Sequence, residues 1–251
     1  MNAPRHPRVL AEEVPVALVY HGSTLAVMMA TPADIADFAR GFTLTEGIAR
    51  PDQITEMEVV ESDAGIEARM WLADDCAAAL TERRRMLAGP VGCGLCGIDS
   101  LEQALRPLPQ VRAGWTLSDD QVRAAPDRLR LHQPGHDQTR AMHAAGFWVP
   151  GQGIVIARED VGRHNALDKL IGALLTAGID PATGAVVLTS RVSTEMVQKC
   201  AFAGAPIIIA VSAPTAQAVR LAEDAGITLA ALVRATSHEV FSHPYRITDV
   251  R

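Results

Sequence analysis

The segment at 186–211, VVLTSRVSTEMVQKCAFAGAPIIIAV, decides the fold of this chain. Two short apolar runs, 186–188 and 206–211, flank a stretch at 194–203 that has the composition of a helix. Short apolar runs rich in β-branched residues predict buried strands. The alternation continues on both sides with strand 154–157, helix 166–176, helix 215–225 and strand 227–233. Strands that alternate with helices predict a mostly parallel sheet covered on both faces, which is an α/β fold.

The first third of the chain has the pattern of a smaller α+β unit. Its first helix is predicted to start at Thr31-Pro32-Ala33-Asp34, because a capping hydroxyl precedes a proline at the first helical position. The other predicted elements are strands at 14–20, 24–29, 57–60 and 68–72 and a helix at 74–86. Four glycines and a proline within 89–97 then predict a loop. We therefore expect a small N-terminal α+β domain at 1–88, a Gly-rich Cys-x-x-Cys loop at 89–98 and a larger α/β domain at 99–251.

Composition excludes several classes of protein. The chain has 251 residues, of which 48% are hydrophobic and 21% charged, so it can bury a core and is not a disordered chain. A net charge of −6 argues against a nonspecific nucleic-acid binder. No secretory signal and no apolar run of the ~20 residues that a membrane span needs are present. We expect a soluble protein of the reducing cytoplasm, where only four cysteines do not make a disulfide scaffold.

Cys93 and Cys96 form a Cys-x-x-Cys pair inside the glycine-rich segment. Two thiols at this spacing can share a metal, form a reversible disulfide, or let one sulfur resolve an adduct on the other. No second Cys-x-x-Cys completes a zinc site, although His132, His136 and His143 could supply ligands. Pro134 and Gly135 argue against the helix that would place two of these histidines on one face. A buried pair of small apolar side chains is the simplest alternative.

Polar segments follow three of the predicted strands. In sheets of this type, ligands bind beyond the carboxyl ends of the strands. Hydroxyls and guanidinium groups at helix N-termini can bind an anion such as a phosphate. Salt bridges within a solvated loop and ordinary helix capping, by Ser193 and by Asn165 ahead of a helix at Ala166, are the alternatives. The candidate binding residues are Arg163, His164, Asn165, Arg191, Ser193 and Ser212.

The C-terminal segment combines aromatic, hydroxyl, imidazole and guanidinium groups, which suits stacking on a planar ring. Its residues are Phe241, Ser242, His243, Pro244, Tyr245 and Arg246. A terminal strand that packs on the core is the alternative. We expect Arg83-Arg84-Arg85 to be a solvated helix face, and the isolated Cys76 and Cys200 to be packing residues.

Taken together, the motifs resemble the formate dehydrogenase accessory sulfurtransferases, the FdhD/NarQ family. The resemblance covers nearly the whole chain, and its most specific part is the string at 159–169. The matching segments are Gly94-Leu-Cys-Gly97 with Cys93, Glu159-Asp-Val-Gly-Arg-His-Asn-Ala-Leu-Asp-Lys169, Arg191-Val-Ser-Thr-Glu-Met-Val-Gln-Lys199, Val211-Ser-Ala-Pro-Thr215, Gly41-Phe42, Glu46-Gly-Ile48 and 241–246.

The resemblance implies a sulfur carrier that accepts persulfide sulfur from a cysteine desulfurase. That sulfur passes to the molybdenum (or tungsten) bis(guanine dinucleotide) cofactor before the cofactor enters the catalytic subunit of formate dehydrogenase. By the family's pattern, Cys93 carries the persulfide beside Cys96, and 241–246 binds the cofactor. The resemblance further implies a cytidine-deaminase-like larger domain and a homodimer. We expect no permanently bound cofactor or metal, transient binding of the cofactor or of GDP-like nucleotides, and no nucleic-acid or membrane partner.

Two departures and two alternatives accompany this interpretation. The family usually has Ser-Gly-Arg where this chain has Thr189-Ser190-Arg191, and small residues where it has Arg140 and Met142. Deaminase chemistry is excluded, because neither histidine before Cys93 belongs to the His-x-Glu motif that it requires. One alternative is a chaperone that binds and delivers the guanine-dinucleotide cofactor without handling sulfur. The other is a zinc-stabilised binding module.

Overall fold

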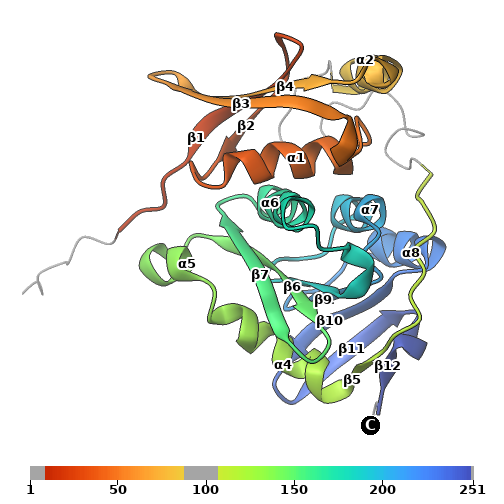
Figure 1. Cartoon of the computed structure of the whole chain (residues 1–251). Coiled ribbons are helices and arrows are strands. Elements are labelled where there is room, and N and C mark those ends of the chain that lie inside the picture. Colours follow the sequence, from red (N-terminus) through yellow and green to blue (C-terminus); the bar gives the residue numbers. More distant parts are fainter. Residues whose placement is uncertain (1–8, 88–106, 250–251) are drawn as a thin grey trace, which may run out of the picture.

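Two units, each with its own sheet and apolar core, make up the structure (Figure 1). It is a computed structural model, and it describes residues 9–87 and 107–249. The predicted loop at 89–98, with Cys93 and Cys96, lies outside the described residues, and the domain boundaries placed there stay predictions. The chain is a mixed α/β protein, as the alternating pattern predicts.

The N-terminal unit is a four-stranded sheet with a helix packed on one face. Its strands are β1 (Val14–Tyr20), β2 (Ser23–Ala30), β3 (Ile54–Ser62) and β4 (Gly65–Leu72), in the order β2-β1-β4-β3. β1 runs parallel to β4, and the other neighbours are antiparallel. Every second side chain of β4, Met70 among them, is buried, and Tyr20 and Phe38 fill the core with these side chains. The helices are α1 (Ile35–Thr45), η1 (Pro51–Gln53), η2 (Asp74–Cys76) and α2 (Ala77–Leu87).

The predicted start of the first helix is wrong by several residues. α1 begins at Ile35, behind an N-cap, Asp34, in the left-handed region whose side chain makes no capping bond. Thr31 serves the other unit instead, since its backbone N–H donates to Asp160 and its hydroxyl accepts from the N–H of Val161. Contacts between the two units therefore outweigh a local capping pattern.

The larger unit is a six-stranded sheet in the order β11-β10-β9-β8-β6-β7. Its strands are β6 (His143–Val149), β7 (Gly153–Asp160), β8 (Ala185–Leu188), β9 (Ile207–Ala210), β10 (Thr228–Arg234) and β11 (Ser237–Ser242). Only β8, β9 and β10 are parallel neighbours, whereas β6 runs antiparallel to both β7 and β8. The sheet is mixed rather than mostly parallel, because β6 and β11 run antiparallel to their neighbours. Neither strand was among those that the alternating pattern predicts.

Helices cover both faces of this sheet. On one face lie α6 (Arg163–Thr176), α7 (Thr194–Ala203) and α8 (Ala216–Ala225), and on the other lies α4 (Asp119–Arg130). Val186 and Leu188 point to the first face and Val187 to the second. The predicted capping box at Ser118 and Gln121 opens α4, and this prediction is confirmed. The remaining elements are α5 (Pro134–Thr139), η3 (Pro181–Thr183), η4 (Pro244–Arg246) and the paired β5 (Leu117–Ser118) and β12 (Ile247–Thr248).

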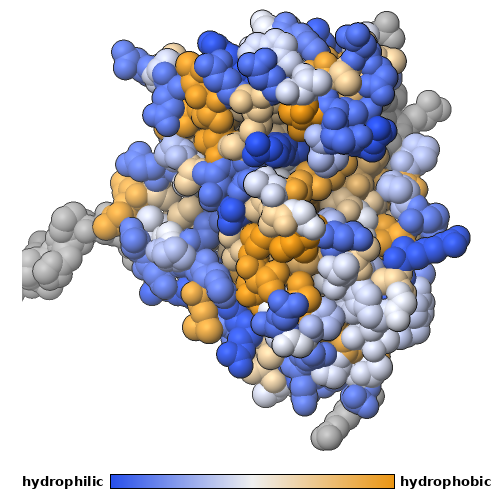
Figure 2. All heavy atoms as spheres, in the orientation of Figure 1, coloured by the Kyte–Doolittle hydropathy of each residue, from blue (hydrophilic) through white to orange (hydrophobic). Residues whose placement is uncertain are grey.

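α6 and α7 form the layer between the two units. α1 packs on α6 and touches α7, so these helices carry the N-terminal sheet above the larger one (Figure 1). β7 is an edge strand of the larger sheet. Apolar side chains gather over β7, near the middle of the face of the molecule that Figure 2 shows. None of the helices in the described ranges is long and apolar enough to cross a membrane.

Candidate functional site

Six predicted binding residues lie at one edge of the larger sheet. β7, β8 and β9 point the same way, and the loops after them lead into α6, α7 and α8. The loops after β8 and β9 are tied together by backbone hydrogen bonds between Val192 and the segment 213–215. The structure thus brings to this edge Arg163, His164, Asn165, Arg191, Ser193 and Ser212.

The N-termini of α6 and α7, like those of α1 and α5, lack side-chain caps. Gly162 precedes α6, and the hydroxyl of Ser193 ahead of α7 is buried and has no hydrogen-bond partner in the described part of the chain. By contrast, Ser118 and Thr215 each accept a hydrogen bond from the first turn of α4 and α8. The Nε of Arg163 is also buried without a partner among the described residues. Free N–H groups, the positive end of each helix dipole and a guanidinium group make this edge suited to an anion.

Asp160 and Asn165 fasten the loop after β7 instead of facing solvent. Asp160 accepts from the N–H of Gly162 at 2.7 Å and from Asn165 at 3.0 Å, and its other oxygen lies 2.6 Å from Nζ of Lys169. Asn165 also donates to the carbonyl of Met29 on β2. The prediction that Asn165 caps a helix at Ala166 is wrong, because α6 already begins at Arg163 and the amide is buried within its first turn.

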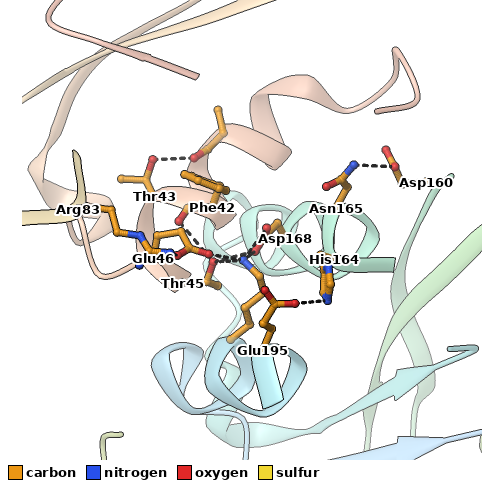
Figure 3. A network of polar contacts seen from close by, with 12 residues as sticks. Phe42, Thr43, Thr45, Glu46, Arg83, Asp160, His164, Asn165, Asp168 and Glu195 are labelled. Atoms are coloured by element: carbon orange, nitrogen blue, oxygen red, sulfur yellow. Dashed lines mark hydrogen bonds and ion pairs between the residues drawn. The ribbon is translucent and has the colours of Figure 1, made fainter. Parts of the chain in front are cut away.

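Lys199 lies in a second buried cluster with Thr45, Glu46 and Asp168, which Figure 3 labels. Its Nζ lies 2.9 Å from Asp168 on α6, 2.8 Å from Glu46 and 3.1 Å from the hydroxyl of Thr45, at the end of α1. The ring of Phe42 lies 5.4 Å from the same ammonium group. Burial disfavours the charge of Lys199, but Asp168 and Glu46 outweigh burial and raise its pKa. The cluster therefore holds a charged ammonium group where α1, α6 and α7 meet.

His164 and Glu195 connect the starts of α6 and α7. His164 Nε2 lies 2.7 Å from a Glu195 carboxylate oxygen (Figure 3). Sequence reasoning gave no role to Glu195 or to Lys199. One signal in the sequence could have indicated these two residues. Glu195 and Lys199 are four residues apart, as are His164 and Asp168, and this spacing places each pair on one face of a helix.

The predicted C-terminal binding segment lies at the opposite edge of the sheet. β11 runs antiparallel to β10, so its end lies beside the start of β10, far along the strands from the loops described above. The Ser242 hydroxyl donates to the carbonyl of Ile227, and Arg246 donates to the carbonyl of Gly226 at the end of α8. Tyr245 is 63% exposed, between His243 and Arg246. Within one chain, the structure does not bring Phe241–Arg246 to the other six residues, and its binding role stays a prediction.

Several smaller predictions can be compared with the structure. The argument against one helix that carries both His132 and His136 is confirmed, because α4 ends at Arg130 and α5 begins only at Pro134. No group of three or more potential metal ligands occurs in residues 9–87 and 107–249. Arg83 and Arg84 are not simply solvated, since they contact Glu46 and the carbonyl of Tyr20. Cys76 and Cys200 are buried, and burial raises the pKa of the Cys200 thiol to about 12.

Known proteins resemble this chain in sequence and in structure. A sequence model of the FdhD/NarQ family matches residues 11–248, nearly the whole chain. The chain belongs to the FdhD/NarQ family. It is 52% identical over 242 residues to the sulfur carrier protein FdhD of Agrobacterium fabrum, covering 96% of this chain and 89% of that protein. The FdhD of Cupriavidus necator is also 52% identical, over 243 residues, covering 96% and 84% of the two chains.

The fold also resembles that of a solved structure. A crystal structure of a formate dehydrogenase accessory protein from Desulfotalea psychrophila matches with a TM-score of 0.74 and 28% identity. The match covers 95% of this chain and 90% of the other. The recognition of the FdhD/NarQ family from the motifs at 159–169 and 191–199 is confirmed.

Proposed function

We propose that this protein is a sulfurtransferase needed for formate dehydrogenase activity. It accepts persulfide sulfur on Cys93 from a cysteine desulfurase and passes the sulfur to the molybdenum bis(molybdopterin guanine dinucleotide) cofactor. The support comes from relatives that are named sulfur carriers and from a structural relative named as a formate dehydrogenase accessory protein. The family expectation of a cytoplasmic homodimer that meets the catalytic subunit of formate dehydrogenase belongs to the same proposal.

The observation that carries the proposal is the pair of uncapped helix N-termini at the carboxyl edge of the larger sheet. The cofactor bears pyrophosphate groups, and such groups bind at helix N-termini beside guanidinium and hydroxyl groups. Ser193 and Arg163 each place a buried polar atom there that no described residue satisfies. A buried polar atom without a partner costs free energy, so a ligand that supplies the partner is stabilised. We assign the phosphates to this edge, since Tyr245 and the rest of the C-terminal segment lie at the opposite edge of the same chain.

The sulfur chemistry follows thiol–disulfide exchange. The Cys93 thiolate attacks the terminal sulfur of the donor persulfide, a new S–S bond forms, and the donor cysteine leaves as a thiolate. Attack of the Cys96 thiolate on the Cys93 sulfur would then release the terminal sulfur to the metal as sulfide. That step leaves a Cys93–Cys96 disulfide, so the thiol pair supplies the two electrons that reduce the transferred sulfur. A cellular thiol would then reduce the disulfide for another turn.

Replacing Cys93 tests the proposal against its alternative, a chaperone that delivers the cofactor without handling sulfur. We expect Cys93→Ala to abolish formate dehydrogenase activity in cells that lack any other copy of this protein. Cys76→Ala is the matched control, because Cys76 is a buried packing residue outside the proposed chemistry. Full activity with Cys93→Ala would reject sulfur transfer and favour the chaperone.

A further inference from the structure

A cavity of about 520 Å³ opens between α4 and the turn that joins β6 to β7. Trp148 at the end of β6, Ile154 at the start of β7 and the exposed Leu131 supply its apolar wall. Small-molecule sites measure roughly 300–1,000 Å³ and combine apolar walls with a few polar groups. β6 starts and β7 ends at the carboxyl edge, so the cavity lies at the opposite end of these strands. The cavity is therefore separate from the proposed phosphate site.

The polar part of the cavity wall is rich in hydrogen-bond donors, and none of the described residues that line it is acidic. Arg128 supplies a guanidinium group. The side-chain carbonyl of Gln121 already accepts from the N–H of Ser118, which leaves the amide N–H groups of Gln121 for another partner. Gln152 and His132 complete the polar part of the wall. A wall with these groups favours an anion with hydrogen-bond acceptors.

Arg128 differs from the other two arginines of α4. Arg123 and Arg130 each form ion pairs with nearby aspartates. Arg128 is exposed, and it forms no ion pair with any residue in the ranges 9–87 and 107–249. The planar fork of a guanidinium group can hold a carboxylate by two parallel hydrogen bonds. Arg128 thus brings to an apolar cavity a cation that no described acidic side chain neutralises.

We propose that this cavity binds a small carboxylate with a flat apolar body. Arg128 holds the carboxylate, Gln121 donates to it, and the apolar body lies against Trp148 and Ile154. Burial of apolar area stabilises any ligand of this shape, whereas the guanidinium group selects the anion. A single guanidinium group matches the single charge of a carboxylate better than the charge of a phosphate ester, which is close to two.

NMR titration with 2-naphthoate tests the site, and 2-naphthamide, which has the same shape and no charge, is the matched control. The indole N–H of Trp148 is buried without a hydrogen-bond partner in the described part of the chain, so its signal reports on the surroundings of the ring. We expect 2-naphthoate to shift this signal, to leave that of Trp71 on β4 unchanged, and to bind at least tenfold more tightly than 2-naphthamide. Equal affinity of the two probes, or no shift of the Trp148 signal at millimolar 2-naphthoate, would overturn the proposal.

Two substitutions at exposed positions test the selection of the anion. Arg128→Gln should weaken binding of 2-naphthoate about tenfold, which corresponds to the loss of one charge-assisted contact, and should leave the affinity for 2-naphthamide unchanged. Gln152→Glu adds a negative charge to the wall and should weaken binding of 2-naphthoate roughly threefold. Arg220→Gln on the exposed side of α8 is the control and should bind both probes as the wild type does. An affinity for 2-naphthoate that Arg128→Gln leaves unchanged, or an equal loss for both probes, would overturn the proposal.

Discussion

A Cβ atom on Gly41 of α1 would overlap the backbone carbonyl oxygen of Asp168 on α6 and would lie 2.9 Å from the backbone nitrogen of Gly172. The approach is reciprocal, since a Cβ atom on Gly172 would overlap the carbonyl of Asp37. Two glycines thus let the backbones of α1 and α6 meet with no side chain between them. The close approach sets the distance at which Thr45 and Glu46 reach Lys199.

Gly41→Ala should therefore destabilise the protein by roughly 3 kcal/mol, because backbone atoms cannot move aside as a flexible side chain can. Gly114→Ala is the control, since nothing lies within 4 Å of its added Cβ atom, and it should change stability little. Urea unfolding of the two variants measures the difference. Equal midpoints would show that the helices are not in such close contact.

Both lysines of the chain, Lys169 and Lys199, are buried between the two units, and all other basic side chains are arginine or histidine. Lysine is normally a surface residue. An amine-reactive ester should therefore label only the α-amino group of the folded protein, with Lys169 and Lys199 becoming reactive on unfolding. Peptide mapping after brief labelling checks this, and rapid labelling of either lysine under native conditions would contradict the buried clusters.

Lys199→Met should cost about 3–5 kcal/mol of stability, because it leaves the carboxylate of Asp168 buried without its cation, whereas Glu46 keeps Arg83. Arg220→Met on the exposed side of α8 removes a cation without exposing a buried partner, and it should cost less than about 0.5 kcal/mol. Thermal unfolding compares the two variants. A loss of similar size in both would argue against the cluster as the joint between α1, α6 and α7.

His143 at the start of β6 reports on the charge of the carboxyl edge. Burial lowers its pKa below the usual 6.5, and the nearby Arg163, His136 and His164 lower it further. The unfolded chain binds a proton at this histidine at a higher pH than the folded protein does. The free energy of unfolding should therefore fall as the pH drops from 6.5 through the folded pKa. His143→Asn should make that fall shallower, which unfolding at several pH values would detect.

The same histidine gives a direct test for an anion at this edge. Pyrophosphate bound there would offset the neighbouring cations, so it should raise the pKa of His143 in an NMR titration. Sulfate-free buffer with chloride at equal ionic strength is the control. A pKa that pyrophosphate leaves unchanged would contradict the assignment of phosphates to the carboxyl edge.

The sequence predicts strands best where apolar residues form short runs. The apolar runs at 186–188 and 206–211 and the helix at 194–203 were placed correctly, because short β-branched runs between helices have few other solutions. β6 was missed because its sequence, HAAGFWV, is nearly all buried between two neighbouring strands and shows no alternation.

The polar clusters could not be predicted, because their members are distant in sequence. Lys199 meets Glu46 across 153 positions and Asp168 across 31. The motifs did indicate that these side chains matter, but not which of them pair. The sequence also could not predict the position of Arg246, because that position depends on β11 running antiparallel to β10 at the edge of the sheet.

The proposed sulfur transfer depends on a persulfide on Cys93, and mass spectrometry can detect such an adduct. The purified protein is incubated with a cysteine desulfurase and cysteine, and sulfur adducts are mapped by peptide. Cys200 serves as an internal control, because its burial and raised pKa keep it unreactive. We predict one added sulfur on Cys93 that mild reduction removes. No adduct on either Cys93 or Cys96, with an active desulfurase, would contradict the account and favour a cofactor chaperone.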